Sequence, residues 1–416
     1  MTPHRPLLRP HLRPVAALLA IAATVTALDA PPQVTVRDFA LDPMGNLAFH
    51  DDRVVLHPKL LLGAGADSNV YATKTDRIQD CYFEALAGLE ARYDIGDSQR
   101  LTGNLEIESK RWVKEEDRDM IGGRGRLDWL HNDGAGLETR ATAGYARIDD
   151  PLVESGVRIE RGVGDGGIGV DWEGRTLRLA GGLAFVGEKY FDDGINWTAE
   201  ERRNQRLTAD ATAGWRYASD AETYARIVGD AWRYPDETSR FRNSNGVQAL
   251  AGWRAAPSTR TKVLAELGVE YRAYSGYYLD DSNYGDDHTL TPAADLSAAY
   301  LWEEGSSATL HGYSHMVGST TSNGSLLYGA AADLRYRLRT KAFLLAQVQT
   351  YHLTDSGSAV GVPVEERATN AGHLGAEYLL REGVAVRLIG GYEQSWAQLG
   401  EDYERWSGSL VTAVAF

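Results

Sequence analysis

The chain has 416 residues, a formal net charge of −15 and a mean hydropathy of −0.36. The acidity argues against nucleic acid as a partner, and the single cysteine, Cys81, excludes an internal disulfide and cysteine-paired metal sites. The low hydropathy excludes a bundle of apolar membrane helices, but it leaves open a membrane β-barrel, in which only alternate residues face lipid.

The N-terminus has the three parts of a secretory signal: a basic region with three arginines, an apolar stretch and small residues for cleavage. The apolar stretch, residues 15–27, is too short to span a bilayer as a helix. Residues 1–27 are therefore predicted to be a cleaved signal peptide. Residues 28–57 lack the repeat that follows and are predicted to be a short periplasmic lead-in.

Residues 58–416 alternate between apolar and polar side chains in short segments separated by turns, which predicts an antiparallel β-structure. In the segment 81–94, for example, Phe83 and Tyr93 share one face and Glu84 lies on the other. The pattern gives about eighteen strands, an even number as single-chain bacterial barrels require. The predicted strands are 58–69, 81–94, 99–112, 119–131, 136–147, 158–172, 175–189, 201–217, 222–234, 241–254, 260–273, 288–302, 306–316, 325–338, 341–352, 366–380, 383–395 and 403–416.

Aromatic residues precede the short turns and have the parity of the aliphatic face. A ring of Trp and Tyr at one height is typical of a barrel where hydrocarbon gives way to lipid headgroups. A β-propeller is disfavoured because no blade signature repeats, and a sandwich because the apolar faces are rich in Ala and Gly. The predicted interface girdle consists of Tyr93, Trp129, Trp172, Trp215, Trp253, Trp302, Tyr336 and Tyr378.

The last segment ends in an aromatic residue. Phe416 shares the lipid-facing parity with Leu410 and Val414. This ending resembles the C-terminal signal that the barrel assembly machinery reads in outer-membrane proteins. We therefore expect an all-β, up-and-down transmembrane barrel in the outer membrane of a Gram-negative-type envelope. Its expected partners are outer-membrane lipids, lipopolysaccharide and the assembly machinery.

The inward face carries charges of both signs, which require water or mutual pairing. Most are expected to form cross-strand pairs, such as Arg124 or Arg126 with Glu106 or Glu108. A barrel of this size leaves an aqueous lumen, and neither sign dominates it. The predicted pore-lining residues are Arg124, Arg126, Arg140, Arg178, Arg206, Arg226, Arg272, Arg335, Arg337, Arg387, Glu106, Glu108, Asp210, Asp230, Glu266 and Asp333.

Five aromatic residues also have inward parity: Trp232, His311, Tyr313, His315 and Tyr351. Two interpretations remain open. The rings form a track for sugar rings, or they fill the lumen.

The long connections are acidic, most densely from Asp280 to Asp287. Carboxylates could bind calcium there, but the spacing is not that of an EF-hand and a solvated loop is favoured. Serine, histidine and acidic residues form no recognisable catalytic motif. No enzyme activity, metal or cofactor is predicted.

The segment from Gly65 to Tyr71 (GADSNVY) resembles the start of a family of outer-membrane β-barrel porins. Some members of that family occur beside exopolysaccharide export machinery. The rest of the resemblance is architectural and covers roughly Leu60 to Phe416. It implies an eighteen-strand channel, with polysaccharide and periplasmic export proteins as expected partners.

Three functions remain open from the sequence. The first is the outer-membrane pore for exopolysaccharide export, which is favoured by the resemblance alone. The second is a general or nutrient diffusion porin. The third is a non-conducting structural or adhesive barrel. All three have the same fold, so the sequence does not separate them.

Overall fold

The computed structural model describes most of the chain from residue 47 onward. The described residues are 47–49, 53–75, 77–151, 158–191, 203–236, 242–274, 288–303, 305–317, 324–356, 366–398 and 402–416. The predicted signal peptide and the acidic stretch from Asp280 to Asp287 lie outside them. Within the described segments, no helix is both long and apolar enough to cross a bilayer.

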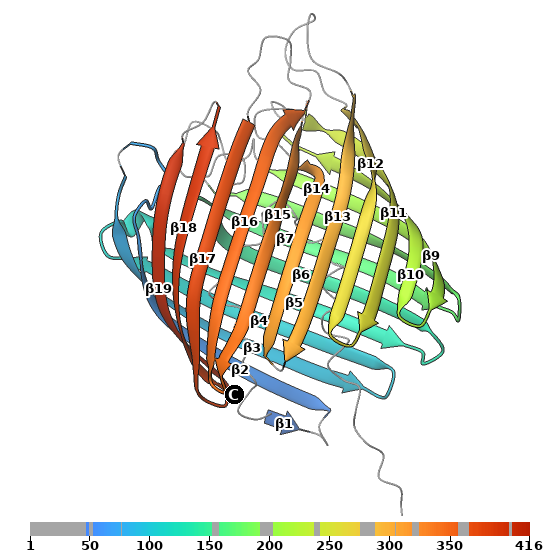
Figure 1. Cartoon of the computed structure of the whole chain (residues 1–416), viewed down its shortest axis with the longest axis horizontal. Coiled ribbons are helices and arrows are strands. Elements are labelled where there is room, and N and C mark those ends of the chain that lie inside the picture. Colours follow the sequence, from blue (N-terminus) through green and yellow to red (C-terminus); the bar gives the residue numbers. More distant parts are fainter. Residues whose placement is uncertain are drawn as a thin grey trace, which may run out of the picture.

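The described strands form one 19-stranded antiparallel sheet that closes on itself (Figure 1). Each strand pairs with its sequence neighbours, and the last strand pairs with β2 to complete the ring. The predicted all-β, up-and-down barrel of eighteen strands is confirmed. Its strands are β2 (Val54–Asp67), β3 (Asp80–Ile95), β4 (Gln99–Trp112), β5 (Met120–Asn132), β6 (Leu137–Pro151), β7 (Arg158–Glu173), β8 (Leu177–Tyr190), β9 (Asn204–Ala218), β10 (Ala221–Arg233), β11 (Ser244–Ser258), β12 (Thr261–Tyr274), β13 (His288–Glu303), β14 (Ser306–Val317), β15 (Gly324–Arg339), β16 (Ala342–Ser356), β17 (Glu366–Arg381), β18 (Val384–Ala397) and β19 (Tyr403–Ala415).

A nineteenth strand, β1 (Leu47–Phe49), lies at the short-turn end of the barrel (Figure 1). It pairs with residues 54–56 of β2. The final strand, β19, reaches β2 only as far as Lys59. The edge of β2 beyond that point would otherwise carry unpaired backbone groups, so β1 extends the ladder where β19 ends.

The outer surface is apolar, as a bilayer requires. Large exposed side chains such as Phe83, Leu127, Leu290 and Leu374 lie on the face opposite the charges. All eight predicted girdle residues have this outward parity, and the rings of Trp302 and Tyr336 contact each other with centroids 6.0 Å apart. The exterior therefore matches a barrel embedded in the outer membrane.

The short turns are built by specific backbone chemistry. Between β5 and β6, Asp133 accepts hydrogen bonds from the backbone N–H groups of Leu137 and Ala135, at 2.9 and 2.7 Å. These bonds hold the pKa of the Asp133 carboxyl below its ordinary value. Gly134 and Gly136 adopt φ of 72° and 106°, which side chains rarely tolerate. Short turns mark the periplasmic end of such barrels, and longer connections the outer end.

One proline changes the wall at the outer end. Pro292 lies within β13, and the β13–β14 ladder begins only at Ala294 and Ser314. Proline has no N–H to donate to a neighbouring strand. The end of β14 instead turns inward: the backbone N–H of Met316 reaches Glu270 on β12 at 3.4 Å, and Val317 joins a buried interior cluster.

Candidate functional site

The interior of the barrel is the candidate site. The strand register places every predicted pore-lining residue on the inward face. They divide by exposure. Ten are half-buried or exposed: Arg124, Arg126, Arg140, Arg178, Arg206, Arg226, Arg335, Arg337, Asp210 and Asp333. Six are buried and belong to the packed wall: Glu106, Glu108, Asp230, Glu266, Arg272 and Arg387.

Buried inward charges are paired. Arg124 bonds Glu106, one of the pairings expected from the sequence, and Lys59 binds the same carboxylate. Arg126 instead pairs with Asp128 on its own strand at 3.0 Å and reaches Asp165 at 3.5 Å. These ion pairs compensate the buried charges on the inner face of the barrel wall, as burial of charge requires.

Several of these contacts join strands that are not neighbours, across a glycine on the strand between them. Asp230 of β10 and Arg272 of β12 share a register row with Gly246 of β11, and their side chains meet at 2.9 Å. A Cβ atom on Gly246 would lie 2.4 Å from Oδ1 of Asp230 and 2.7 Å from Nη2 of Arg272. Gly88 has the same role between Lys59 and Glu106. We call such positions bridge glycines.

A bridge glycine is also found between Tyr224 and Glu266, whose hydroxyl and carboxylate are 2.7 Å apart. Gly252 lies between them, and a Cβ there would be 2.2 Å from Cζ of Tyr224. Gly252→Val is therefore expected to break this bond and destabilise the barrel by about 1–3 kcal/mol, the usual cost of overpacking. Denaturant unfolding of the refolded protein measures it.

The matched control is Gly229→Val. Gly229 lies on the outward face of β10, where nothing approaches a built Cβ within 4 Å. This variant is expected to unfold at the wild-type denaturant concentration. Equal destabilisation of both variants would mean that glycine is needed for the strand itself and not for the bridge.

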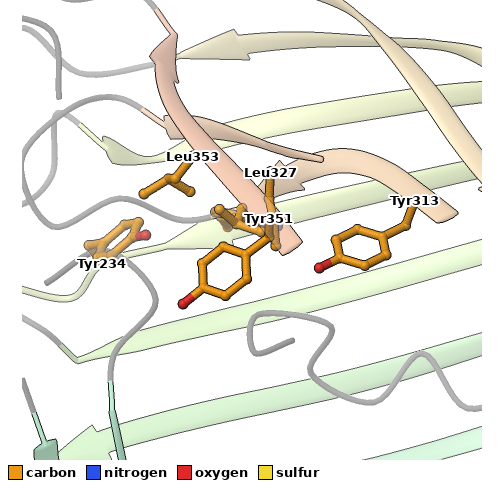
Figure 2. Packing of buried hydrophobic residues seen from close by; sticks show 7 residues of the cluster. Tyr234, Tyr313, Leu327, Tyr351 and Leu353 are labelled. Atoms are coloured by element: carbon orange, nitrogen blue, oxygen red, sulfur yellow. The ribbon is translucent and has the colours of Figure 1, made fainter. Parts of the chain in front are cut away.

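One sector of the lumen is filled at the outer end. Trp232 of β10 packs with residues from β14, β15 and β16 in a buried cluster, and Figure 2 shows Tyr313, Leu327 and Tyr351 of that cluster together inside the barrel. The Trp232 ring also contacts two guanidinium groups, those of Arg272 and Arg206, which lie 4.4 and 5.2 Å from the ring centroid. Burial of Trp232, Tyr313 and Tyr351 favours the filling interpretation of the inward aromatics over a sugar track.

The opposite sector is open. Between β5 and β9 most inward side chains are half-buried or exposed, including Arg140, Asp171 and Asp210. On β7 and β8 the inward positions in mid-strand are small: Gly167, Gly169, Ala180, Gly182 and Ala184. The lumen is thus asymmetric: one side is filled by packed side chains, and the other is polar and has small side chains in mid-strand.

Sequence reasoning missed the bridge glycines, the inward turn of β14 and the packed sector. Pro292 was the available signal for the second of these, since proline inside a strand predicts a broken ladder. Among the described residues, no group of three or more His, Cys, Asp or Glu side chains is arranged to hold a metal ion.

Comparison with known proteins gives architectural likenesses only. No family model and no curated protein matches the chain. Among solved structures, it is similar to OccAB1 of Acinetobacter baumannii at 10% identity and a TM-score of 0.47, covering 90% of this chain and 100% of that one. It is also similar to the outer membrane protein opdK of Pseudomonas aeruginosa at 12% identity and a TM-score of 0.46, covering 87% and 99%. Pseudomonas aeruginosa OprD is a third, at 12% identity and a TM-score of 0.43, covering 91% and 99%. At these identities the likeness concerns the fold alone.

Proposed function

We propose that the chain is an outer-membrane channel for small hydrophilic solutes. The observation that carries the proposal is the open sector between β5 and β9, where charged side chains such as Arg140 and Asp171 are partly exposed inside a lipid-embedded barrel. Ions of this kind need water beside them. The packed sector narrows the outer half, which favours small solutes over a polymer.

Export of exopolysaccharide rests on the resemblance of residues 65–71 alone, and we rank it second. A non-conducting scaffold is the third possibility. Purified barrel in liposomes is expected to admit small sugars and amino acids without a partner protein, as measured by osmotic swelling. Vesicles that contain the heat-denatured chain are the control. Silent bilayers would overturn the channel, and blockage by polysaccharide of a large conductance would favour export.

A second test locates the water path. Cys81 is the chain's single cysteine, so Cys81→Ser provides a background free of thiols. In that background, Ala184→Cys on the open inward face of β8 is expected to react with a charged methanethiosulfonate reagent, which should lower the bilayer current. Ala371→Cys is the control, because Ala371 is buried on the inward face of β17 and is expected to stay unmodified. Faster reaction at Ala371 would contradict the assignment of the open sector.

A further inference from the structure

Four strands of the open sector share one register row with opposite charges at its ends. Arg140 of β6 pairs with Gly169 of β7, Gly169 with Gly182 of β8, and Gly182 with Asp210 of β9. Both intervening positions are glycines, so no side chain separates the guanidinium from the carboxylate. We call this row, with its small neighbours, the shelf.

The next row continues the low floor. It runs from Thr142 of β6 through Gly167 and Ala184 to Thr208 of β9. Hydroxyl groups therefore border the floor at both edges, and two small residues lie between them. Small residues thus occupy the middle of both rows, and larger polar side chains lie at their ends.

The charges at the two ends differ in how they are engaged. Arg140 is about half exposed, and its Nε and Nη2 bond Glu138 of the same strand, which leaves Nη1 outside that pair. Asp210 leans over the shelf: a Cβ built on Gly182 would be 3.1 Å from its Oδ1. Within the described part of the chain, Asp210 makes no ion pair or side-chain hydrogen bond. Neighbouring carboxylates do have partners, for example Asp165 with Arg126 and Asp171 with Arg178.

The spacing suits a bridging molecule. Three strand spacings of 4.7–4.9 Å place the backbones of Arg140 and Asp210 about 14 Å apart. The Asp210 side chain lies over Gly182, whereas the Arg140 side chain bonds Glu138 of its own strand, so the two side chains do not meet. A solute with a carboxylate at one end and an ammonium at the other can contact both, whereas a solute of single charge is attracted to one end and repelled by the other.

We infer that the shelf binds small zwitterions, such as free amino acids, on their way through the lumen. The carboxylate lies toward Arg140, the ammonium lies toward Asp210, and the methylene groups cross Gly169 and Gly182. This inference rests on the proposed channel function and names the solute class that the channel prefers.

The test compares glycine with glycolamide, its uncharged isomer, in swelling of liposomes that contain the full mature barrel. The measured quantity is the rate of glycine entry divided by the rate of glycolamide entry. This ratio is expected to be about two- to fivefold higher for the wild type than for Asp210→Asn or Arg140→Gln, the range that a half-exposed ion pair supports. Asp210→Asn removes the charge of a residue that has no ion-pair or side-chain hydrogen-bond partner among the described residues, and this variant is expected to fold normally. Gly182→Val, which displaces the Asp210 carboxylate, is expected to lose the same preference.

The control is Arg100→Gln, an exposed inward arginine near a short turn that pairs with Asp94 at 2.7 Å. It should retain the wild-type ratio of glycine to glycolamide. A ratio in wild type equal to that of Asp210→Asn overturns the shelf and leaves the channel standing. Exclusion of both solutes overturns the channel itself, so the two failures are distinguishable.

Discussion

Replacing Arg272 by methionine is expected to destabilise the barrel by about 3–5 kcal/mol, which is the usual cost of leaving buried partners of an ion pair uncompensated. The Arg272 side chain is 1% exposed and bonds Asp230 at 2.9 Å and Glu270 at 2.7 Å. It also donates to Oγ of Ser244 at 3.0 Å and lies against the ring of Trp232. Its loss leaves the buried Glu270 carboxylate without a cation, and Asp230 keeps only the longer contact to Arg206, at 3.8 Å. Equilibrium unfolding of the refolded protein in detergent measures the effect.

Two further variants separate charge from packing. Adding Asp230→Asn and Glu270→Gln to Arg272→Met is expected to restore much of the lost stability, since the uncompensated charges are removed. Arg100→Met removes an exposed arginine and is expected to change stability by no more than about 1 kcal/mol. If the triple variant is no more stable than Arg272→Met, then lost packing, and not buried charge, accounts for the effect.

Asp67→Asn is expected to weaken the joint between the first and last barrel strands by about 3 kcal/mol. Asp67 is buried, and its Oδ2 accepts a hydrogen bond from Nε of Arg405 on β19 at 2.8 Å. The substitution keeps the shape and the acceptor oxygen for the backbone N–H of Asn69 but removes the charge. Because the pair joins the first and last strands of the barrel, the variant should unfold at a lower temperature. Gel electrophoresis of samples heated to increasing temperatures measures the temperature at which the folded form is lost.

The residues after Asp67 make the same joint specific. Ser68 donates its backbone N–H to the carbonyl of Trp406 at 2.9 Å and accepts the N–H of Trp406 on Oγ at 2.7 Å. Asn69, fully buried, donates to the carbonyls of Thr73 and Glu404 at 2.7 and 3.1 Å. Residues of the Asp-Ser-Asn-Val segment therefore hold β2 and β19 together where the barrel closes.

Lys74→Gln provides the control at the same joint. Lys74 pairs with Asp402 at 3.0 Å, but the Lys74 side chain is exposed and that of Asp402 is partly exposed. Its removal should leave the transition temperature unchanged, because solvent screens such pairs. A shift as large as that of Asp67→Asn would show that any charge loss at this joint is damaging.

The period-2 pattern was sufficient to predict the strands and the face on which each charge lies, because side chains of a strand alternate strictly. Trp215 and Arg206, for instance, are assigned to the correct faces of β9. Burial on the inward face could not be predicted in the same way. Arg140 and Arg272 have the same parity, but Arg272 is buried among partners from β10 and β11, and its partner Glu270 accepts the backbone N–H of Met316 on β14. Only the closed barrel brings these strands together.

The structural role of the Asp-Ser-Asn-Val segment could not be predicted from the sequence either. Its resemblance to other barrels indicates a family and, through that family, a solute. One of the two carbonyls to which Asn69 donates, that of Glu404, lies 335 residues away in the chain. No local pattern encodes a partner at that separation, so the segment's structural role required the closed ring.

Because of the bridge glycines, the glycine positions of this barrel wall differ in how well they tolerate substitution. Substitution of Gly246 or Gly252 by alanine places a methyl group between two interacting side chains. The same change at Gly229 or Gly390 meets open space on the membrane side. A saturation library selected for correctly assembled barrels should therefore deplete alanine at the first pair of positions and retain it at the second.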